Sequence, residues 1–190
     1  MRVGPRSITT PSGGTHKCDG TNNGANPAPG AASIGGIDVA SSLCSFSFDG
    51  TWSSQFDDFF ITKIGSDDSN AGSNRYWGVL ENFQFTPAGG CETAEYDGSD
   101  GLWAYDAFNK NYFLDVEPRT RTVAPGQTVS FKVVDGTNRG TAISGAIFNH
   151  QTSNANGDVL FTAPTTPGVY RYKAERSDSI RSPAVVITVI

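Results

Sequence analysis

The 190-residue sequence is poor in charged residues, methionine, histidine and cysteine. Charged residues make up 17% of it, and it holds one Met, two His and three Cys. No apolar run reaches the ~18 residues that a membrane-spanning helix needs, so we expect no membrane insertion. The composition also excludes a Met-rich groove and a His-rich metal protein. The formal net charge of −5 argues against nucleic-acid binding, because phosphate recognition needs a basic face.

The sequence also lacks the common motifs of enzymes and of cofactor-binding proteins. The sequence has no Gly-x-Ser-x-Gly, no Gly-x-Gly-x-x-Gly, no Walker-type loop and no Cys-x-x-Cys. His16 and His150 lie in opposite halves of the chain, without a nucleophile at triad spacing. We therefore predict that the protein is not an enzyme and holds no cofactor and no metal ion.

Two acidic segments deserve a separate assessment. Asp57 and Asp58 are adjacent on a predicted strand, so their side chains point to opposite faces and cannot share a proton. We interpret them as a solvated pair on an edge strand. The oxygen-rich segment 66–70 makes Asp67 and Asp68 weak calcium candidates, but it lacks the twelve-residue spacing with a terminal Glu that a calcium loop has.

The residues that are abundant favour a β-rich protein with many turns. There are 22 Gly and 10 Pro, while 12 Phe and a hydrophobic content of 37% still allow a core. The first ten residues contain no apolar segment of the kind found in signal peptides. Loops rich in Gly, Ser, Thr and Asn, together with cysteines beside turn residues, nevertheless favour an extracellular or cell-wall protein whose signal peptide has been removed.

The three cysteines differ in their surroundings. Cys18 and Cys91 lie in glycine-flanked loops, and we predict that they form a disulfide. Cys44 lies in the alternating apolar run 43–48 and is interpreted as a small buried hydrophobic residue.

Charge and composition change near residue 117. Residues 1–117 carry six Lys or Arg and fifteen Asp or Glu, whereas residues 118–190 carry eight and four. The first half is therefore acidic (6 − 15 = −9) and the second basic (8 − 4 = +4), which supports two domains, 1–117 and 118–190.

The two halves carry different secondary-structure patterns. Alternating apolar residues and turn signals predict strands in the second half at 128–134, 142–148, 158–163, 169–174 and 184–190, which is the pattern of a small β-sandwich. The first half has one helix candidate, 31–43, although Gly35 and Gly36 each cost ~1 kcal/mol relative to Ala. Its predicted strands are 56–64, 75–80, 83–86, 101–107 and 111–116, giving an α+β domain with one short helix.

Two resemblances extend this interpretation. The first resemblance is carried by residues 76–91 and 97–105, together with residues 18–27, 56–61 and 107–110. These segments resemble a secreted, fungal-type branch of the domain-of-unknown-function family related to the C-terminal β-domain of transcobalamin and intrinsic factor. The resemblance covers about residues 7–117 and implies a β-grasp-like sheet, secretion and paired cysteines at Cys18 and Cys91. The second half resembles the immunoglobulin-like modules of bacterial surface proteins.

Aromatic residues are the remaining candidates for ligand binding. Aromatic faces in grooves stack on sugar rings, and polar rims bind the hydroxyl groups. We interpret Trp77 and Trp103 as core residues on adjacent strands, and Trp52 and Tyr112 as more exposed. The full set of ligand-binding candidates is Trp52, Tyr76, Trp77, Trp103, Tyr105 and Tyr112.

The sequence thus predicts a secreted or cell-surface, non-catalytic binding or structural protein that recognises wall polysaccharide or a surface protein. Two alternatives remain open. One is a small-molecule carrier similar to the corrinoid-binding half-domain, which a deep apolar pocket walled by Trp77 or Trp103 would favour. The other is a carbohydrate-active enzyme, which would need two carboxyl groups facing each other across a cleft.

Overall fold

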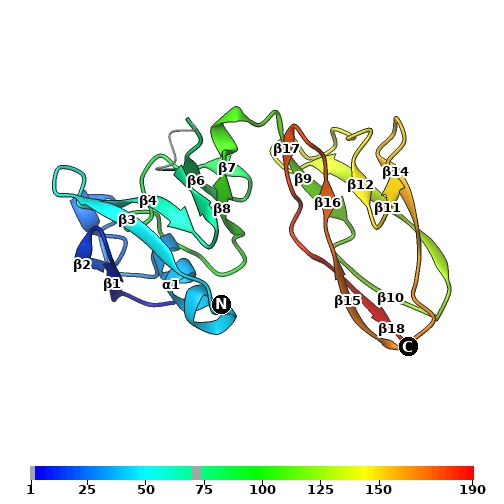
Figure 1. Cartoon of the computed structure of the whole chain (residues 1–190), viewed down its shortest axis with the longest axis horizontal. Coiled ribbons are helices and arrows are strands. Elements are labelled where there is room, and N and C mark those ends of the chain that lie inside the picture. Colours follow the sequence, from blue (N-terminus) through cyan, green and yellow to red (C-terminus); the bar gives the residue numbers. More distant parts are fainter. Residues whose placement is uncertain (1–2, 70–73) are drawn as a thin grey trace. The chain divides into compact units, whose positions relative to one another are not determined.

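A computed structural model describes residues 3–69 and 74–190 of the chain. The fold is mainly β, with 44% of the residues in strands. The chain divides into two compact units, Met1–Phe108 and Asn109–Ile190, hereafter the N-terminal and C-terminal units (Figure 1). The boundary between the two units follows residue 108, whereas the sequence predicted it after residue 117. The reason is that strand β9 (Tyr112–Glu117) pairs with β11 (Thr128–Asp135) and so belongs to the C-terminal unit.

In its described part, the N-terminal unit has helix α1 (Ser33–Cys44) and three small sheets, ordered β1–β2, β3–β4–β5 and β7–β6–β8. All strand pairs within these sheets are antiparallel. The strands are β1 (Arg6–Thr10), β2 (Gly14–Cys18), β3 (Phe48–Ser53), β4 (Asp58–Ile64), β5 (Asp67–Asp68), β6 (Trp77–Glu81), β7 (Gln84–Phe85) and β8 (Gly101–Tyr105). The described part of this unit also includes the short 3-10 helices η1 (Asn22–Gly24) and η3 (Ala107–Asn109).

Helix α1 begins two residues later than expected and ends one residue later. It buries Ile34 and Ile37 on one side, whereas Leu43, which the apolar spacing also places on that face, is 71% exposed near the end of the helix. The helix ends where Ser45 adopts the left-handed conformation at φ 54°, which terminates many helices.

The β1–β2 hairpin was not predicted from the sequence. Its strands carry mostly Thr, Ser, His and Lys, and only alternate positions such as Ile8 and Thr10 are buried. The Thr10 hydroxyl donates to the carbonyl oxygen of Gly50 at 2.6 Å, which joins the hairpin to β3. Gly50 lies at a bulge in β3 and has no room for a side chain, because a Cβ there would lie 2.8 Å from the carbonyl oxygen of Phe60.

The predicted disulfide between Cys18 and Cys91 is confirmed, and it lies within the core of the N-terminal unit. This core also holds Ile8, Ala32, Ile34, Ile37, Phe48, Phe59 and Ile61. The prediction for Cys44 was wrong: its thiol is free and exposed. Cys44 is the last residue of α1, and the buried residues of this helix lie in its first turns, at Ser33, Ile34 and Ile37.

The C-terminal unit contains sheets ordered β14–β11–β9–β17, β10–β18–β15 and β13–β12–β16. Two pairings are parallel, β10 with β18 and β17 with β9. Besides β9 and β11, the strands are β10 (Thr120–Val123), β12 (Ile147–Phe148), β13 (Gln151–Thr152), β14 (Asp158–Thr162), β15 (Gly168–Tyr172), β16 (Ala174–Glu175), β17 (Ser179–Ile180) and β18 (Val185–Val189).

One core joins these sheets. Alternate residues of β11, such as Phe131 and Val133, pack with Phe161 of β14 and Ile187 of β18, all 2% exposed or less. The alternation used to predict these strands therefore marks their buried face.

The expected strand 142–148 is largely wrong. Only Ile147–Phe148 is a strand, because Gly145 has φ 76° and turns the chain before it. The Ser153 hydroxyl stabilises this turn by donating to the carbonyl oxygen of Ile143 at 2.7 Å and accepting from the amide of Ala146 at 2.9 Å.

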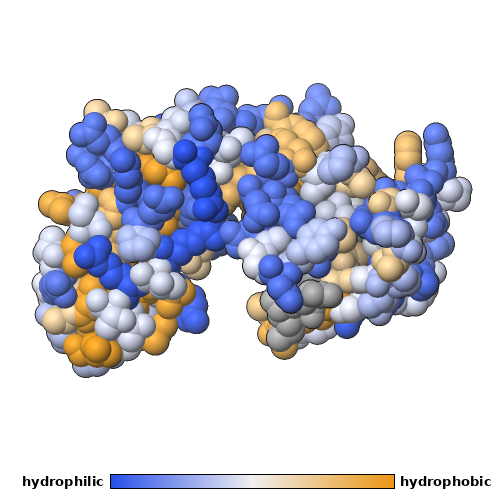
Figure 2. Space-filling model, turned by 180° about the vertical axis from the view of Figure 1, so that it is seen from behind, coloured by the Kyte–Doolittle hydropathy of each residue, from blue (hydrophilic) through white to orange (hydrophobic). Residues whose placement is uncertain are grey.

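The outer surface is mixed in polarity. Figure 2 shows one face of the molecule, on which hydrophobic residues form separate areas between hydrophilic ones. In the described residues, no helix has the length and apolar character needed to cross a membrane.

Candidate functional site

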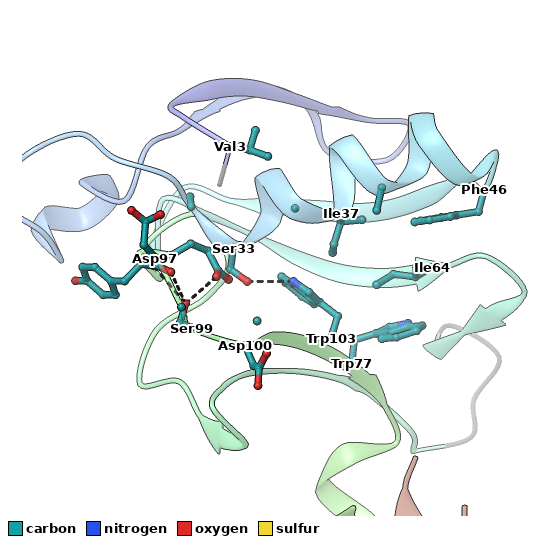
Figure 3. Close-up of a pocket in the computed structure, with 17 residues that line it drawn as sticks. Val3, Ser33, Ile37, Phe46, Ile64, Trp77, Asp97, Ser99, Asp100 and Trp103 are labelled. Atoms are coloured by element: carbon teal, nitrogen blue, oxygen red, sulfur yellow. Dashed lines mark hydrogen bonds between the residues drawn. The ribbon is translucent and has the colours of Figure 1, made fainter. Parts of the chain in front are cut away.

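A pocket of about 600 Å³ lies in the N-terminal unit between α1, the β7–β6–β8 sheet and the loop 95–101 (Figure 3). This volume is within the range of small-molecule sites. The described residues that line the pocket are Val3, Ala32, Ser33, Gly36, Ile37, Ala40, Phe46, Ile64, Trp77, Glu95, Tyr96, Asp97, Gly98, Ser99, Asp100, Gly101 and Trp103.

One face of α1 forms a wall of the pocket. Ser33, Gly36, Ile37 and Ala40 are spaced by three or four residues, so they lie on the same side of the helix. Gly36 is exposed, and a Cβ built there would meet no atom within 4 Å. Glycine in a helix costs ~1 kcal/mol relative to alanine, and here it leaves open space that a larger side chain would fill.

Two tryptophans from adjacent strands form the opposite wall. In the β6–β8 register Val79 pairs with Trp103 and Trp77 pairs with Tyr105, which places both indoles on the same face of the sheet. The Trp103 Nε1 group donates to the buried Ser33 hydroxyl at 3.2 Å, which fixes this indole against α1. The Trp77 Nε1 group is buried and makes no hydrogen bond within the described residues.

The pocket has an acidic end and an apolar end. Figure 3 shows Asp97, Ser99 and Asp100 at one end and Phe46 and Ile64 at the other, with Trp103 between them. No Lys, Arg, His or Cys is among the described lining residues.

The loop 95–101, which forms the acidic end, is held in place at several points. The Glu95 amide donates to the carbonyl oxygen of Ala31 at 3.0 Å, and the Ser99 hydroxyl donates to a Glu95 carboxylate oxygen at 3.3 Å. The Asp100 amide donates to the Asn82 side-chain oxygen at 3.1 Å. A Cβ on Gly101 would collide with the Glu95 carboxylate, so glycine at this position lets that side chain lie across the strand.

The structure brings only part of the predicted aromatic set together. Trp77 and Trp103 pack against the core, as expected, and they also line the pocket. Tyr105 lies beside Trp77 with ring centroids 5.3 Å apart, and its hydroxyl donates to the carbonyl oxygen of Asp68. Tyr76 is 43% exposed and lies near Phe60 instead, 6.2 Å between ring centroids.

The two aromatic residues expected to be more exposed are covered by other side chains. The His16 ring stacks on Trp52 with 3.8 Å between centroids and 3° between planes. Tyr112 belongs to the C-terminal unit, where the Arg176 guanidinium lies 4.6 Å from its ring centroid. Neither ring lines the main pocket.

The stacked His16 and Trp52 belong to a second, smaller pocket of about 240 Å³. Asp19 lies in the same pocket, where hydrogen bonds from the Lys17 ammonium and the Thr21 hydroxyl lower the pKa of its carboxyl group to about 2. Apart from Trp52, the described residues that line this pocket are polar.

The interpretation of Asp57 and Asp58 as a solvated pair is wrong for Asp58. Asp57 is exposed, but Asp58 is 6% exposed and accepts hydrogen bonds from the amides of Cys91 at 3.0 Å and Phe59 at 2.6 Å. Gly89 makes room for its carboxylate, since a Cβ there would lie 2.5 Å from an Asp58 oxygen. Burial raises the pKa of Asp58 from 3.8 to about 6, although these amide groups oppose the shift.

The weak calcium candidates lie on β5. Asp67 is exposed, while Asp68 pairs with Lys63 of β4 through the sheet register. Asn70, the end of the oxygen-rich segment, lies outside the described residues. Within residues 3–69 and 74–190, no group of three or more His, Cys, Asp or Glu side chains is arranged to hold a metal ion.

Sequence reasoning missed most of the pocket lining outside the two tryptophans. A Gly or Ala at every third or fourth position of α1, here Gly36 and Ala40, signals a helix face with free space. The run 97–101 contains two Gly and two Asp, which signals a polar loop. What the sequence lacks is the information that this loop lies against that helix face.

The pocket can hold a small molecule with one apolar and one polar end. Comparisons with known proteins do not identify that molecule: no protein-family model, curated protein or solved structure matches the chain.

Proposed function

We propose that the protein is a secreted, non-catalytic binding protein whose N-terminal unit holds a small amphipathic molecule in the pocket between α1 and the β7–β6–β8 sheet. The observation that carries this proposal is the pocket itself, about 600 Å³ in volume and walled by Trp77 and Trp103. Indole rings contribute large apolar contact areas to a ligand.

Two details support a ligand rather than an incidental hollow. Gly36 leaves its part of the helix wall open at a cost in helix stability. The buried Trp77 Nε1 group has no hydrogen-bond partner in the described residues, and an unpaired buried donor costs about 1–3 kcal/mol. An acceptor group on a ligand would remove that cost.

The same geometry makes a flat polysaccharide platform a weaker proposal. His16 covers one face of Trp52, and Trp77 and Trp103 lie within a pocket rather than on an open surface. Recognition of a sugar remains a second candidate because carboxylates beside Trp103 are suited to bind hydroxyl groups.

Secretion and the roles of the two units belong to this proposal as well. The Cys18–Cys91 disulfide supports an oxidising compartment. The suggested relationship of the N-terminal unit to the β-domain of transcobalamin agrees with a carrier role. The C-terminal unit, as an immunoglobulin-like sandwich, would serve as a spacer or a surface for another protein.

A fluorescent ligand tests the proposal. Dansylamide is small, aromatic and uncharged, and indole emission excites it by energy transfer over short distances. All three Trp residues of the chain lie in the N-terminal unit. We expect saturable transfer with a stoichiometry of one.

Two variants of α1 locate the bound dye. Gly36→Phe fills the pocket and should abolish the transfer, and Phe is also a better helix residue than Gly. Ser42→Phe places the same ring at an exposed position of the same helix outside the pocket, and should keep the transfer. Absence of saturable transfer, or equal transfer in both variants, would refute the proposed pocket function.

A further inference from the structure

We propose that the open edge of strand β15 in the C-terminal unit binds an extended, acidic segment of a partner protein, which adds as a further strand to the β10–β18–β15 sheet. The inference rests on the proposed role of this unit as a surface for another protein, and it adds the location and the chemistry of the partner. It does not depend on the pocket of the N-terminal unit.

Strand β15 has a neighbour on one side only. It lies at the end of the described sheet order β10–β18–β15. Its continuation β16 pairs with β12, where Phe148 lies opposite Ala174. The chain then turns away, because Asn149 and His150 are left-handed at φ 45° and 64°. Strand β12 therefore stops before it reaches β15, and Figure 1 shows β12 near β16 while β15 extends toward the C-terminus.

The hydrogen bonds of β18 establish which backbone groups of β15 face the open edge. The amide of Val186 donates at 2.8 Å to the carbonyl oxygen that precedes β10, so Val186 directs its backbone groups toward β10. Adjacent residues of a strand direct these groups to opposite edges, so Ile187 faces β15, where it lies opposite Tyr170. Val169 and Arg171 then direct their amide and carbonyl groups away from β18. These two donors and two acceptors have the spacing that an antiparallel strand needs.

The side chains beside these backbone groups are basic on the outer face of the sheet. Tyr170 and Tyr172 pack against the core of the unit, so the alternate residues Val169, Arg171 and Lys173 point outward. Val169 is 55% exposed. A strand added at this edge would place alternate side chains beside these three residues. Acidic side chains opposite Arg171 and Lys173 would form cross-strand ion pairs.

The C-terminal unit itself does not neutralise this positive charge. Arg171, Lys173 and Arg181 take part in no ion pair within the described part of the chain. Strands β10, β15 and β18 contain no Asp or Glu, and the exposed Glu175 lies beyond them on β16, opposite Ile147 of β12. Partial burial and the charge of Arg181 lower the pKa of Lys173. Negative charge from a partner would relieve the repulsion between the two cations.

Two other occupants fit this edge less well. A second copy pairing through the same strand would bring the Arg171 and Lys173 side chains of both copies together, and like charges on neighbouring strands destabilise a sheet. An acidic polysaccharide would pair with the cations but has no peptide groups to bond in strand register to Val169 and Arg171.

A short synthetic peptide tests the docking site. The probe is an octapeptide in which Glu alternates with Val, blocked at both ends and labelled with an uncharged dye. It is titrated into the intact protein at low ionic strength, with fluorescence anisotropy as the readout. In the expected pairing the Glu residues lie opposite Val169 and Arg171, so the Glu amides point at β15 and the Val amides point away from it.

Matched peptides separate strand addition from attraction by charge. We expect saturable binding of the probe, and binding about tenfold weaker when its Glu amides are N-methylated. N-methylation of the Val amides should leave the affinity within about twofold, because those amides make no bond to β15. Replacement of Glu by Lys should abolish binding.

Variants of the protein locate the site. Arg171→Gln together with Lys173→Gln should weaken binding about tenfold. Arg139→Gln removes an exposed charge elsewhere in the same unit and should leave the affinity unchanged. Val169→Pro removes one amide of the open edge, which does not bond to β18, and should also weaken binding.

The outcomes separate this inference from the pocket function. Equal binding of the peptides methylated at Glu and at Val would refute strand addition, and equal effects of Arg139→Gln and the double variant would refute the location. Absence of peptide binding would overturn the inference, and binding of polygalacturonate in its place would identify the partner as an acidic polysaccharide. Gly36→Phe, which tests the pocket, should leave peptide binding unchanged, so each proposal can fail alone.

Discussion

The buried carboxyl group of Asp58 should make the N-terminal unit less stable as the pH rises from about 4 to about 6. Its pKa is raised from 3.8 to about 6 by burial, so in this interval the folded state binds more protons than the unfolded state. Stability falls with pH wherever the folded state binds more protons. The contribution of Asp58 is therefore most favourable below about pH 4 and is lost as the pH passes 6.

The size of the effect follows from the two pKa values. Each unit of difference corresponds to about 1.4 kcal/mol, so the full shift corresponds to about 3 kcal/mol. Between about pH 4.5 and about pH 7.5, roughly 2 kcal/mol of this is lost. Asp19, whose pKa is lowered from 3.8 to about 2, contributes stability that is fully present above about pH 4 and is lost only as the pH falls toward 2, so it does not alter the decline within this window.

Urea unfolding followed by tryptophan fluorescence measures this dependence in the N-terminal unit alone, because Trp52, Trp77 and Trp103 all belong to it. Asp58→Asn is the matched variant, since an amide resembles the neutral carboxyl group and its oxygen can still accept from the Cys91 amide. We expect the variant to lose most of the decline in unfolding free energy. An equal decline in both proteins, or a wild-type stability that rises over this window, would refute the reasoning.

Two further substitutions test the fold. Replacing Cys18 and Cys91 with serine removes a crosslink between residues 73 apart in the sequence. We expect the unfolding free energy of the N-terminal unit to fall by about 4 kcal/mol in tryptophan-monitored urea unfolding. Cys44→Ser should leave this free energy unchanged, and equal effects of the two replacements would contradict the structural role of the disulfide. Gly157→Ala should destabilise the C-terminal unit by more than about 2 kcal/mol in calorimetry, because φ is +79° and the new Cβ would lie 2.4 Å from the carbonyl oxygen of Val133; an unchanged transition would contradict this backbone geometry.

Period-two alternation predicted the strands of the C-terminal unit well where one face is buried. In β11, Val129, Phe131 and Val133 are buried, while the residues between them are exposed. The same pattern failed at Ala142–Ala146, where the left-handed Gly145 turns the chain although buried apolar residues continue. Burial alone does not distinguish a strand from a turn that packs on the core.

In the N-terminal unit, some elements could not be predicted because their side chains are mostly polar. The β1–β2 hairpin is built largely from Thr, His and Lys, so it lacks the apolar signal that marked β4. Asp58 shows the same limit, since nothing in its neighbours along the chain indicates that the amide of Cys91 meets its carboxylate. Both the β1–β2 hairpin and the burial of Asp58 depend on contacts between segments that are distant in the sequence.

The pocket was predictable only in its tryptophans. Trp77 and Trp103 were expected on adjacent strands, and the register of β6 with β8 places both on one face of the sheet. The position of α1 over that face depends on packing of the whole unit. From the sequence alone, Gly36 indicated only a residue that weakens the helix. In the structure, the missing side chain of Gly36 leaves free space beside α1.

The long covalent loop between Cys18 and Cys91 has a consequence for how the protein withstands proteases. A single cut anywhere between these two residues would leave the two pieces linked through sulfur. Helix α1 and Trp77 lie between these two cysteines in the sequence, whereas Trp103 follows Cys91. A nicked chain would thus keep its parts at high local concentration and separate into two bands only after reduction.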